Sequence, residues 1–243
     1  MKLYWRHFFG NQKRNDIILS DVWAEVKYYE EKDAIESGWL YQSGYWYQSR
    51  STRLNLKGYD KKINLPKNYS YRFESPDKID MNKLDSIYKQ YITVKNFIDF
   101  WNPLEDMTRS KFVVIYDDNN EPVAFTKMNM YNGAIEGNAF AWDYKQPKHQ
   151  LGKKIIDIEA HIALELGYEH LYQGYGYEEC AKYKADFFGF EWWTGTEWSG
   201  DKVLYKLLCE NDSSAKTLEE IMKGRELYNL GVGSSERESL INS

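Results

Sequence analysis

Residues 172–187 combine residue types that could bind a substrate and move a proton. Gly174 and Gly176 leave the backbone uncovered by side chains, so a substrate could lie close to it. Glu178 and Glu179 could accept a proton from an amine, because carboxylates are common general bases. The alternative is an aromatic core beside exposed carboxylates at the start of a helix. Hydroxyl groups and ring faces for relaying a proton or stacking a base are offered by Tyr172, Tyr175, Tyr177 and Tyr183.

A second segment, residues 145–154, is basic and opens a predicted helix. The N–H groups at a helix start and the helix dipole favour a phosphate group there. Acetyl-CoA binders place several glycines at this point so that amides approach the pyrophosphate, whereas this chain has only Gly152. The alternative is a solvated basic helix start. Candidate contacts in the segment are Lys145, Lys148, His149, Gln150, Gly152, Lys153 and Lys154.

Composition and net charge exclude several classes of protein. The chain has 243 residues and a formal net charge of −5, so it is not a strongly cationic nucleic-acid binder. Its aromatic content of 17% excludes a disordered tail. The two cysteines and four histidines show no metal-ligand spacing, so no metal site is expected. Since no membrane span or signal peptide is recognisable, a cytoplasmic location is expected.

Hydrophobic periodicity and turn residues predict the elements that must position these segments. From residue 80 onward, the predicted order is helix, three strands, helix, strand, helix and two strands. This order resembles an acyltransferase lobe of the GNAT type, a mixed sheet with helices on both faces. The ranges are 80–101, 111–116, 122–128, 133–142, 150–166, 170–175, 178–186, 190–193 and 203–208.

A smaller α+β lobe is predicted before residue 80, which would make the protein tandem GNAT-like. Its elements are a strand at 17–29, a short helix at 30–37 ending at Gly38, and paired strands at 39–47 and 53–56. Turn residues at 58–80 would connect the lobes. The predicted regions are therefore 1–79, 80–210 and a helical, partly flexible tail at 211–243 with its helix at 217–228.

Four stretches carry a resemblance to a known family. They read LGKKIIDIEAHIALELGY at 151–168, LYQGY at 171–175, KYKADF at 182–187 and FEWWTGTEW at 190–198. Together they resemble the C-terminal lobe of arginyl-tRNA–protein transferases and of the related leucyl-transferring enzymes. A weaker likeness, SGWLYQSGYWYQSRSTRL at 37–54, extends the resemblance toward the N-terminus.

The resemblance implies roles for residues of the chemical segments. Glu178 would accept a proton from the attacking amine, and Tyr175 would serve as oxyanion donor or proton relay. Lys182 and Lys184, together with lysines of 145–154, would hold tRNA phosphates. The tRNA 3′ end would enter between the splayed third and fourth strands, where a tyrosine could stack on the terminal adenine.

The N-terminal lobe departs from the family pattern. The family's cysteines are absent, with Ser49, Arg50 and Ser51 near the expected place, so a cysteine-held iron–sulfur cluster is not expected. Arg50 and Arg53 could still pair with an acidic acceptor, which the resemblance implies for this lobe.

The predicted function is transfer of an amino acid from charged tRNA to the amine of a protein or peptide N-terminus. No cofactor is expected, and neither a membrane nor DNA is an expected partner. One alternative is an acetyl-CoA-dependent N-acetyltransferase; another is a non-catalytic binding or virion-associated protein. A guanidinium-bearing amino acid would need a carboxylate such as Glu136, Asp143 or Glu179, whereas leucine would need an apolar pocket.

Overall fold

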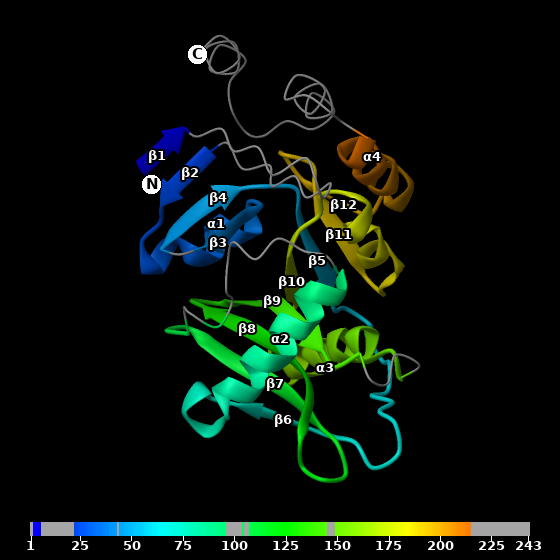
Figure 1. Ribbon diagram of the computed structural model, residues 1–243. Helices are drawn as coiled ribbons and strands as arrows, with labels where there is room; N and C mark the ends of the chain where they lie inside the picture. The colour runs from blue at the N-terminus through cyan, green and yellow to red at the C-terminus, as the bar shows by residue number, and fades with distance from the viewer. Residues whose placement is uncertain are drawn as a thin grey trace. The chain divides into compact units, whose positions relative to one another are not determined.

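The computed structural model describes residues 2–5, 22–42, 44–95, 104, 107–144 and 149–214 (Figure 1). The chain forms two compact units. Unit 1 comprises Met1–Thr52 and Tyr175–Ser243, and unit 2 comprises Arg53–Gly174. This division differs from the predicted one at 79/80 and 210/211, because the chain leaves the first unit and later returns to it.

Unit 2 is built on a mixed sheet with neighbouring strands in the order β5, β10, β9, β8, β7, β6. Strands β9 and β10 are parallel, whereas β6 to β9 pair antiparallel. The strands predicted at 111–116 and 122–128 are confirmed, and they pair as a hairpin. Strand β6 was not predicted; it lies within the segment 58–80 that was expected to connect the lobes. The strands are β5 (Ser51–Asn55), β6 (Ser70–Glu74), β7 (Ser110–Tyr116), β8 (Pro122–Tyr131), β9 (Ala134–Trp142) and β10 (His170–Tyr175), of which β5 and β10 cross the unit boundary.

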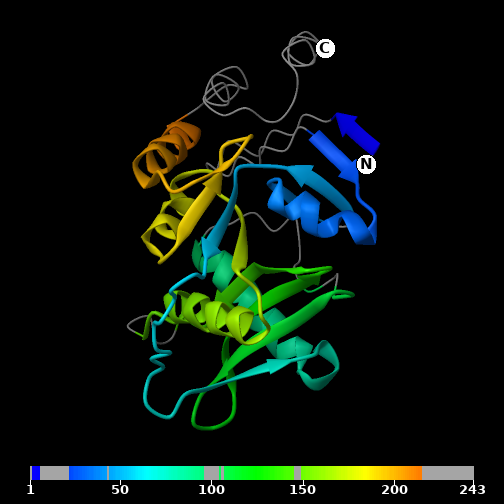
Figure 2. The same cartoon turned by 180° about the vertical axis from the view of Figure 1, so that it is seen from behind.

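Two helices cover opposite faces of this sheet. Helix α2 (Met81–Lys95) lies in front of it in Figure 1, and α3 (Leu151–Glu165) lies in front of it in Figure 2. Asp80 begins α2, since its carboxylate accepts the N–H groups of Asn82 and Lys83. Residues 96–101 of that predicted helix lie outside the described residues.

Unit 1 contains a four-stranded antiparallel sheet in the order β1, β2, β4, β3, beside the short helix α1 (Glu31–Glu36). The predicted pairing of 39–47 with 53–56 is wrong, because 39–47 folds on itself as the hairpin of β3 and β4. Gly38 lies just after α1 with φ +78, and a Cβ there would collide with the Trp193 ring. The strands are β1 (Lys2–Trp5), β2 (Val22–Glu25), β3 (Trp39–Gln42) and β4 (Tyr45–Gln48).

The remainder of unit 1 is C-terminal. A 3₁₀ helix, η5 (Glu179–Asp186), stands where an α-helix was predicted at 178–186. Strands β11 (Phe190–Trp193) and β12 (Trp198–Ser199) follow, paired antiparallel. Helix α4 (Lys202–Ser214) is the last described element. None of the helices in the described part of the chain combines the length and apolarity needed to cross a bilayer.

The predicted strand at 203–208 is wrong, because these residues belong to α4. Asp201 begins the helix by accepting the N–H groups of Val203 and Leu204 at 3.1 and 3.0 Å. A strand would place residues 203, 205 and 207 on one face, whereas Tyr205 is buried and its two partners are exposed. Helical spacing instead buries Tyr205, Leu208, Cys209 and Asp212.

Adjacent leucines in α4 provide a test of which side of this helix is buried. We expect Leu208→Ala, at a buried position, to lower the free energy of unfolding by about 2–5 kcal/mol. Leu207→Ala, at an exposed position, should change it by less than about 1 kcal/mol. Urea unfolding followed by circular dichroism measures both. Equal losses would contradict the helical register.

Candidate functional site

A cluster of buried polar side chains lies on one face of the unit 2 sheet. Alternation along the strands places Ser110, Lys127, Asn129, Tyr131 and Glu136 on this face, and the register puts Asn129 directly opposite Glu136. All five are less than a tenth exposed. Buried polar groups require hydrogen-bond partners, so this cluster has a defined internal arrangement.

Glu136 is the centre of the cluster. Its Oε2 accepts a hydrogen bond from the Tyr131 hydroxyl at 2.6 Å and one from Asn129 Nδ2 at 3.2 Å. Asn138 Nδ2 lies 3.5 Å from the same oxygen. Ser110 in turn donates to Asn129 Oδ1 at 2.9 Å, which fixes the orientation of that amide. The donors therefore converge on Oε2 and leave Oε1 to other contacts.

A β-bulge brings Asn138 into the cluster. Lys127 lies opposite Ala139 and Met128 lies opposite Gly137, so Asn138 is an extra residue in β9. Asn138 Oδ1 is buried and has no hydrogen-bond partner among the described residues. A bulge re-aims a side chain, and here it adds an amide to the surroundings of Glu136.

The opposite face of the sheet supports the bulge. Glu159 of α3 is buried and accepts a hydrogen bond from Thr126 Oγ1 at 2.5 Å. A Cβ on Gly137 would lie 2.5 Å from Glu159 Oε2. A side chain at position 137 would therefore displace the Glu159 carboxylate, which occupies that space.

Burial sets the protonation behaviour of Glu136. Desolvation raises the pKa of the Glu136 carboxyl above its ordinary value, because the charged form loses its water. Hydrogen bonds from Tyr131, Asn129 and Asn138, together with the charge of buried Lys127, oppose this rise. A carboxylate whose pKa is raised by burial is suited to accepting a proton from an amine.

Glu136 stands where the two parallel strands meet. The ladder between β9 and β10 joins Tyr172 to Glu136, whereas the ladder between β8 and β9 runs along nearly the whole of both strands. Gly174 follows at φ +67, and a Cβ there would lie 4.0 Å from Glu136 Oε1. Only glycine leaves this approach to Oε1 uncovered. The predicted substrate contact at Gly174 thus lies beside the buried carboxylate.

The catalytic residues predicted in 172–187 have different surroundings. Tyr172 is buried, whereas Tyr175 is 39% exposed and stacks on Tyr177 at 6.2 Å between ring centroids. Tyr183 is half-buried and makes an edge contact with Phe187. Glu178 is buried in unit 1 at φ 67 and ψ 167, a region that residues with a side chain rarely occupy.

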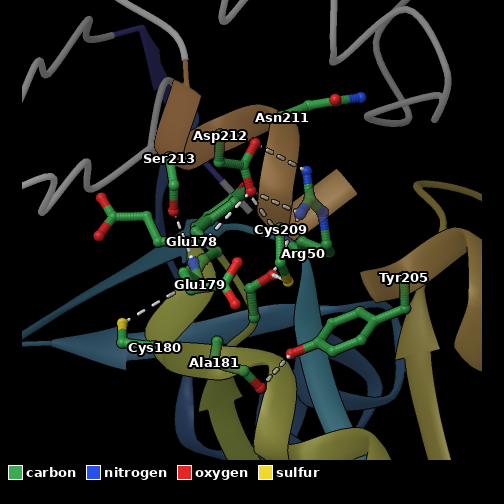
Figure 3. A network of polar contacts seen from close by, with 12 residues as sticks. Arg50, Glu178, Glu179, Cys180, Ala181, Tyr205, Cys209, Asn211, Asp212 and Ser213 are labelled. Atoms are coloured by element: carbon green, nitrogen blue, oxygen red, sulfur yellow. Dashed lines mark hydrogen bonds and ion pairs between the residues drawn. The ribbon is translucent and has the colours of Figure 1, made fainter. Parts of the chain in front are cut away.

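The unusual backbone of Glu178 is held by a buried ion pair (Figure 3). Asp212 accepts the Glu178 N–H at 3.2 Å and binds both guanidinium nitrogens of Arg50, at 2.7 and 3.2 Å. Arg50 also donates to the Gly176 carbonyl, and its N–H donates to the Tyr177 hydroxyl. The predicted pairing of Arg50 with an acceptor substrate does not fit, since the side chain is fully buried and bound to Asp212.

The lysines predicted to hold phosphates in 172–187 have protein partners. Lys182 forms ion pairs with Glu179 and Glu210, which raise the pKa of its ammonium group. Lys184 donates to the Tyr175 carbonyl at 2.6 Å. Both side chains therefore join segments of unit 1. Arg53, predicted beside Arg50, is half-buried on β5.

The basic segment before α3 is only partly described. Lys145 and Lys148 lie outside the described residues. Gly152 is buried, and a Cβ there would lie 2.6 Å from the Trp142 ring. The need for glycine at this position is therefore explained by packing against Trp142, without a phosphate. Gln150 precedes α3 in a left-handed conformation, and Lys153 is exposed. His149 contacts the edge of the Tyr69 ring.

The family comparison covers the region of the Glu136 cluster. The profile of the family described as "Arginine-tRNA-protein transferase, C terminus" matches residues 61–194, more than half of the chain. The chain belongs to this family. The description of the family is that of a transferase. No curated protein matches the sequence.

The chain is similar to several solved structures at low identity. L-PGS from Bacillus licheniformis gives a TM-score of 0.41 at 14% identity, covering 59% of this chain and 49% of that one. A GCN5-related N-acetyltransferase from Kribbella flavida gives 0.41 at 13%, covering 62% and 55%. An aminoglycoside acetyltransferase from a soil metagenome gives 0.38 at 16%, covering 51% and 87%. The chain spans about half the length of the first two.

The sequence carries one signal for the buried polar cluster around Glu136. Lys127 and Glu136 are single charges within strands that are otherwise uncharged. A charged residue inside such a strand must be buried with partners or face a site. The sequence indicates Glu136 only as a possible partner for a guanidinium group. Its hydrogen-bond donors come from a neighbouring strand and from the bulge, and this pairing is not visible in the sequence.

The Arg50–Asp212 pair should be a major contributor to the stability of unit 1. We expect Arg50→Ala to lower the free energy of unfolding by about 3–5 kcal/mol, since Asp212 would be left buried and unpaired. Lys206→Ala, which removes a surface pair with Asp186, should cost less than about 1 kcal/mol. Equal, small losses in urea unfolding would show that the buried pair is not required.

Proposed function

We propose that the protein transfers an aminoacyl group from a charged tRNA to the amine of a protein or peptide N-terminus. The family match supports the reaction class, and the observation that carries the proposal is the buried Glu136 carboxylate beside Gly174. Charged tRNA is the co-substrate, no further cofactor is proposed, and the reaction is placed in the cytoplasm.

The reaction needs little chemistry beyond positioning and one proton transfer. The amine nitrogen attacks the ester carbonyl carbon, a C–N bond forms, and the C–O bond to the tRNA ribose breaks. One proton leaves the nitrogen, and one proton reaches the departing ribose oxygen. Because the ester is already activated, orientation and a modest base account for the rate.

Glu136 Oε1 is the proposed proton acceptor. Tyr131, Asn129 and Asn138 hold the carboxylate through Oε2, so Oε1 keeps its direction toward the backbone of Gly174. A base must lie within hydrogen-bond reach of its proton, and the absence of a side chain at position 174 allows the amine to approach. Carboxylate Oε1 can then return the proton to the ribose oxygen.

Replacing Glu136 tests this role. We expect Glu136→Gln to lower the transfer rate by about 10²–10⁴-fold, because the amide cannot accept the proton. Its oxygen can still accept the hydrogen bonds now made to Oε2, so the variant should fold. The assay combines mixed charged tRNAs with peptides that start with acidic, basic or neutral residues. Transfer is measured as labelled amino acid in peptide.

Control reactions separate the alternatives. Glu178→Gln tests the sequence-predicted base: a loss confined to this variant would move the role from Glu136 to Glu178. An arm with acetyl-CoA replaces the charged tRNA, and acetylation without aminoacyl transfer would establish the N-acetyltransferase instead. No transfer to any peptide from either donor would favour a binding protein.

The raised pKa of Glu136 predicts how pH acts on rate and stability. The base must be ionised, so kcat/KM should fall as pH falls through the raised pKa, and this inflection should be absent in Glu136→Gln. Folding favours the protonated carboxyl, so wild-type stability should decline relative to the variant as pH rises above about 4.5. Thermal unfolding across pH measures the difference. The opposite slope would contradict a desolvated carboxyl.

A further inference from the structure

Residues 57–69, between β5 and β6, form a strap along the outer side of α3. The Tyr59 hydroxyl donates to Asp157 at 2.8 Å, and the Lys61 ammonium lies 3.8 Å from the same carboxylate. Further along, Lys154 donates to the Asn64 carbonyl. These three contacts place the strap on one stripe of the helix surface.

The ends of the strap fix its direction relative to α3. His161 meets the Lys61 carbonyl near the C-terminal half of the helix, and Tyr69 meets His149 just before its start. The strap therefore runs antiparallel to α3. Since a helix rises about 1.5 Å per residue, the stretch from 149 to 161 corresponds to roughly 18 Å.

Exposed lysines without partners gather on this surface. Most described cations are engaged: for example, Lys83 pairs with Glu121 and Lys89 pairs with Asp85. The lysine side chains of the described residues for which no hydrogen bond, ion pair or ring contact exists are Lys57, Lys62, Lys67, Lys78 and Lys153. Of these, only Lys78 lies outside the strap and the first turn of α3, and all are exposed.

Within the strap, basic residues outnumber acidic ones. Asp157 is occupied by Tyr59 and Lys61, and Asp60 is the acidic residue within the strap. The strap itself holds lysines at 57, 61, 62 and 67. In a protein of net charge −5, a local cationic surface about 18 Å long indicates an extended polyanionic partner.

We propose that Lys57, Lys62 and Lys67 of the strap, together with Lys153, bind the phosphate backbone of a double-stranded RNA stem, the acceptor stem of the charged tRNA. This inference rests on the proposed function and adds the surface that would distinguish whole tRNA from its 3′ end. Double-stranded RNA is recognised mostly through its shape, phosphates and 2′-hydroxyls, so a row of exposed lysines without ion-pair partners suits it. Each phosphate contact releases counterions and makes binding salt-dependent.

The test uses an RNA hairpin that has the form of an acceptor stem with a single-stranded 3′ end. Binding to the full chain is measured by fluorescence anisotropy from low to moderate salt. In the triple variant Lys57→Gln, Lys62→Gln, Lys67→Gln, affinity at low salt should fall roughly tenfold, and the salt slope should become shallower by about three. Because these side chains are exposed and make no hydrogen bond, ion pair or ring contact, thermal unfolding should be unchanged.

Two controls make the result specific. Lys78→Gln removes a similarly exposed and unpaired lysine away from the strap, and it should leave hairpin binding unchanged. Transfer from an aminoacylated trinucleotide, which carries the 3′ end without the stem, should proceed at the wild-type rate in the triple variant. Transfer from whole charged tRNA should show a raised KM with little change in kcat.

The outcomes separate this inference from the proposed function. Hairpin binding that the triple variant leaves unchanged would overturn the strap surface, while transfer from the trinucleotide would still support the transferase. If wild-type protein neither binds the hairpin nor transfers from either donor, both proposals fail. Binding to vesicles of phosphatidylserine that is as tight as hairpin binding, and equally reduced in the triple variant, would replace RNA with an anionic membrane surface.

Discussion

The burial of one carboxylate constrains the centre of unit 2. Glu136 is 1% exposed, and a charge in that position is tolerated only where donors satisfy it. The donors are supplied by β8, directly opposite, and by the bulge in β9. Ser110 of β7 then orients Asn129, so three strands must keep their register for the carboxylate to be stable. Because these hydrogen bonds are made to Oε2, the other oxygen, Oε1, is held on the side of Gly174.

In unit 1, two buried charges satisfy each other as an ion pair. Arg50 and Asp212 are separated widely in sequence, and their pairing joins the segment before β5 to helix α4. Asp212 also receives the N–H of Glu178, whose backbone conformation is costly for a residue with a side chain. The pair therefore stabilises a strained segment, while Tyr177 and Gly176 bind the arginine from the other side.

Exposed charge is distributed unequally in the same protein. Most described lysines have carboxylate, carbonyl or ring partners, whereas Lys57, Lys62 and Lys67 of the strap face solvent while its backbone and aromatic side chains contact α3. A strap fixed by Tyr59 and Asn64 presents its lysines at set positions. Such a surface binds a polyanion with less loss of conformational entropy than a free chain would. Net charge alone, at −5, would not have indicated it.

The sequence by itself determined helices α1, α2 and α3, the hairpin of β7 and β8, and the family, because periodicity, caps and turn residues are local properties. It also indicated Gly174, since glycine in a strand marks a close approach. It misassigned 203–208, where apolar residues suit either element and only the burial of Tyr205 and Leu208 separates them. Whether a charged residue serves a site or the fold was decided by tertiary structure alone. Arg50 is bound by Asp212 and Glu136 by groups of neighbouring strands, and such partners are set by packing between segments distant in the chain.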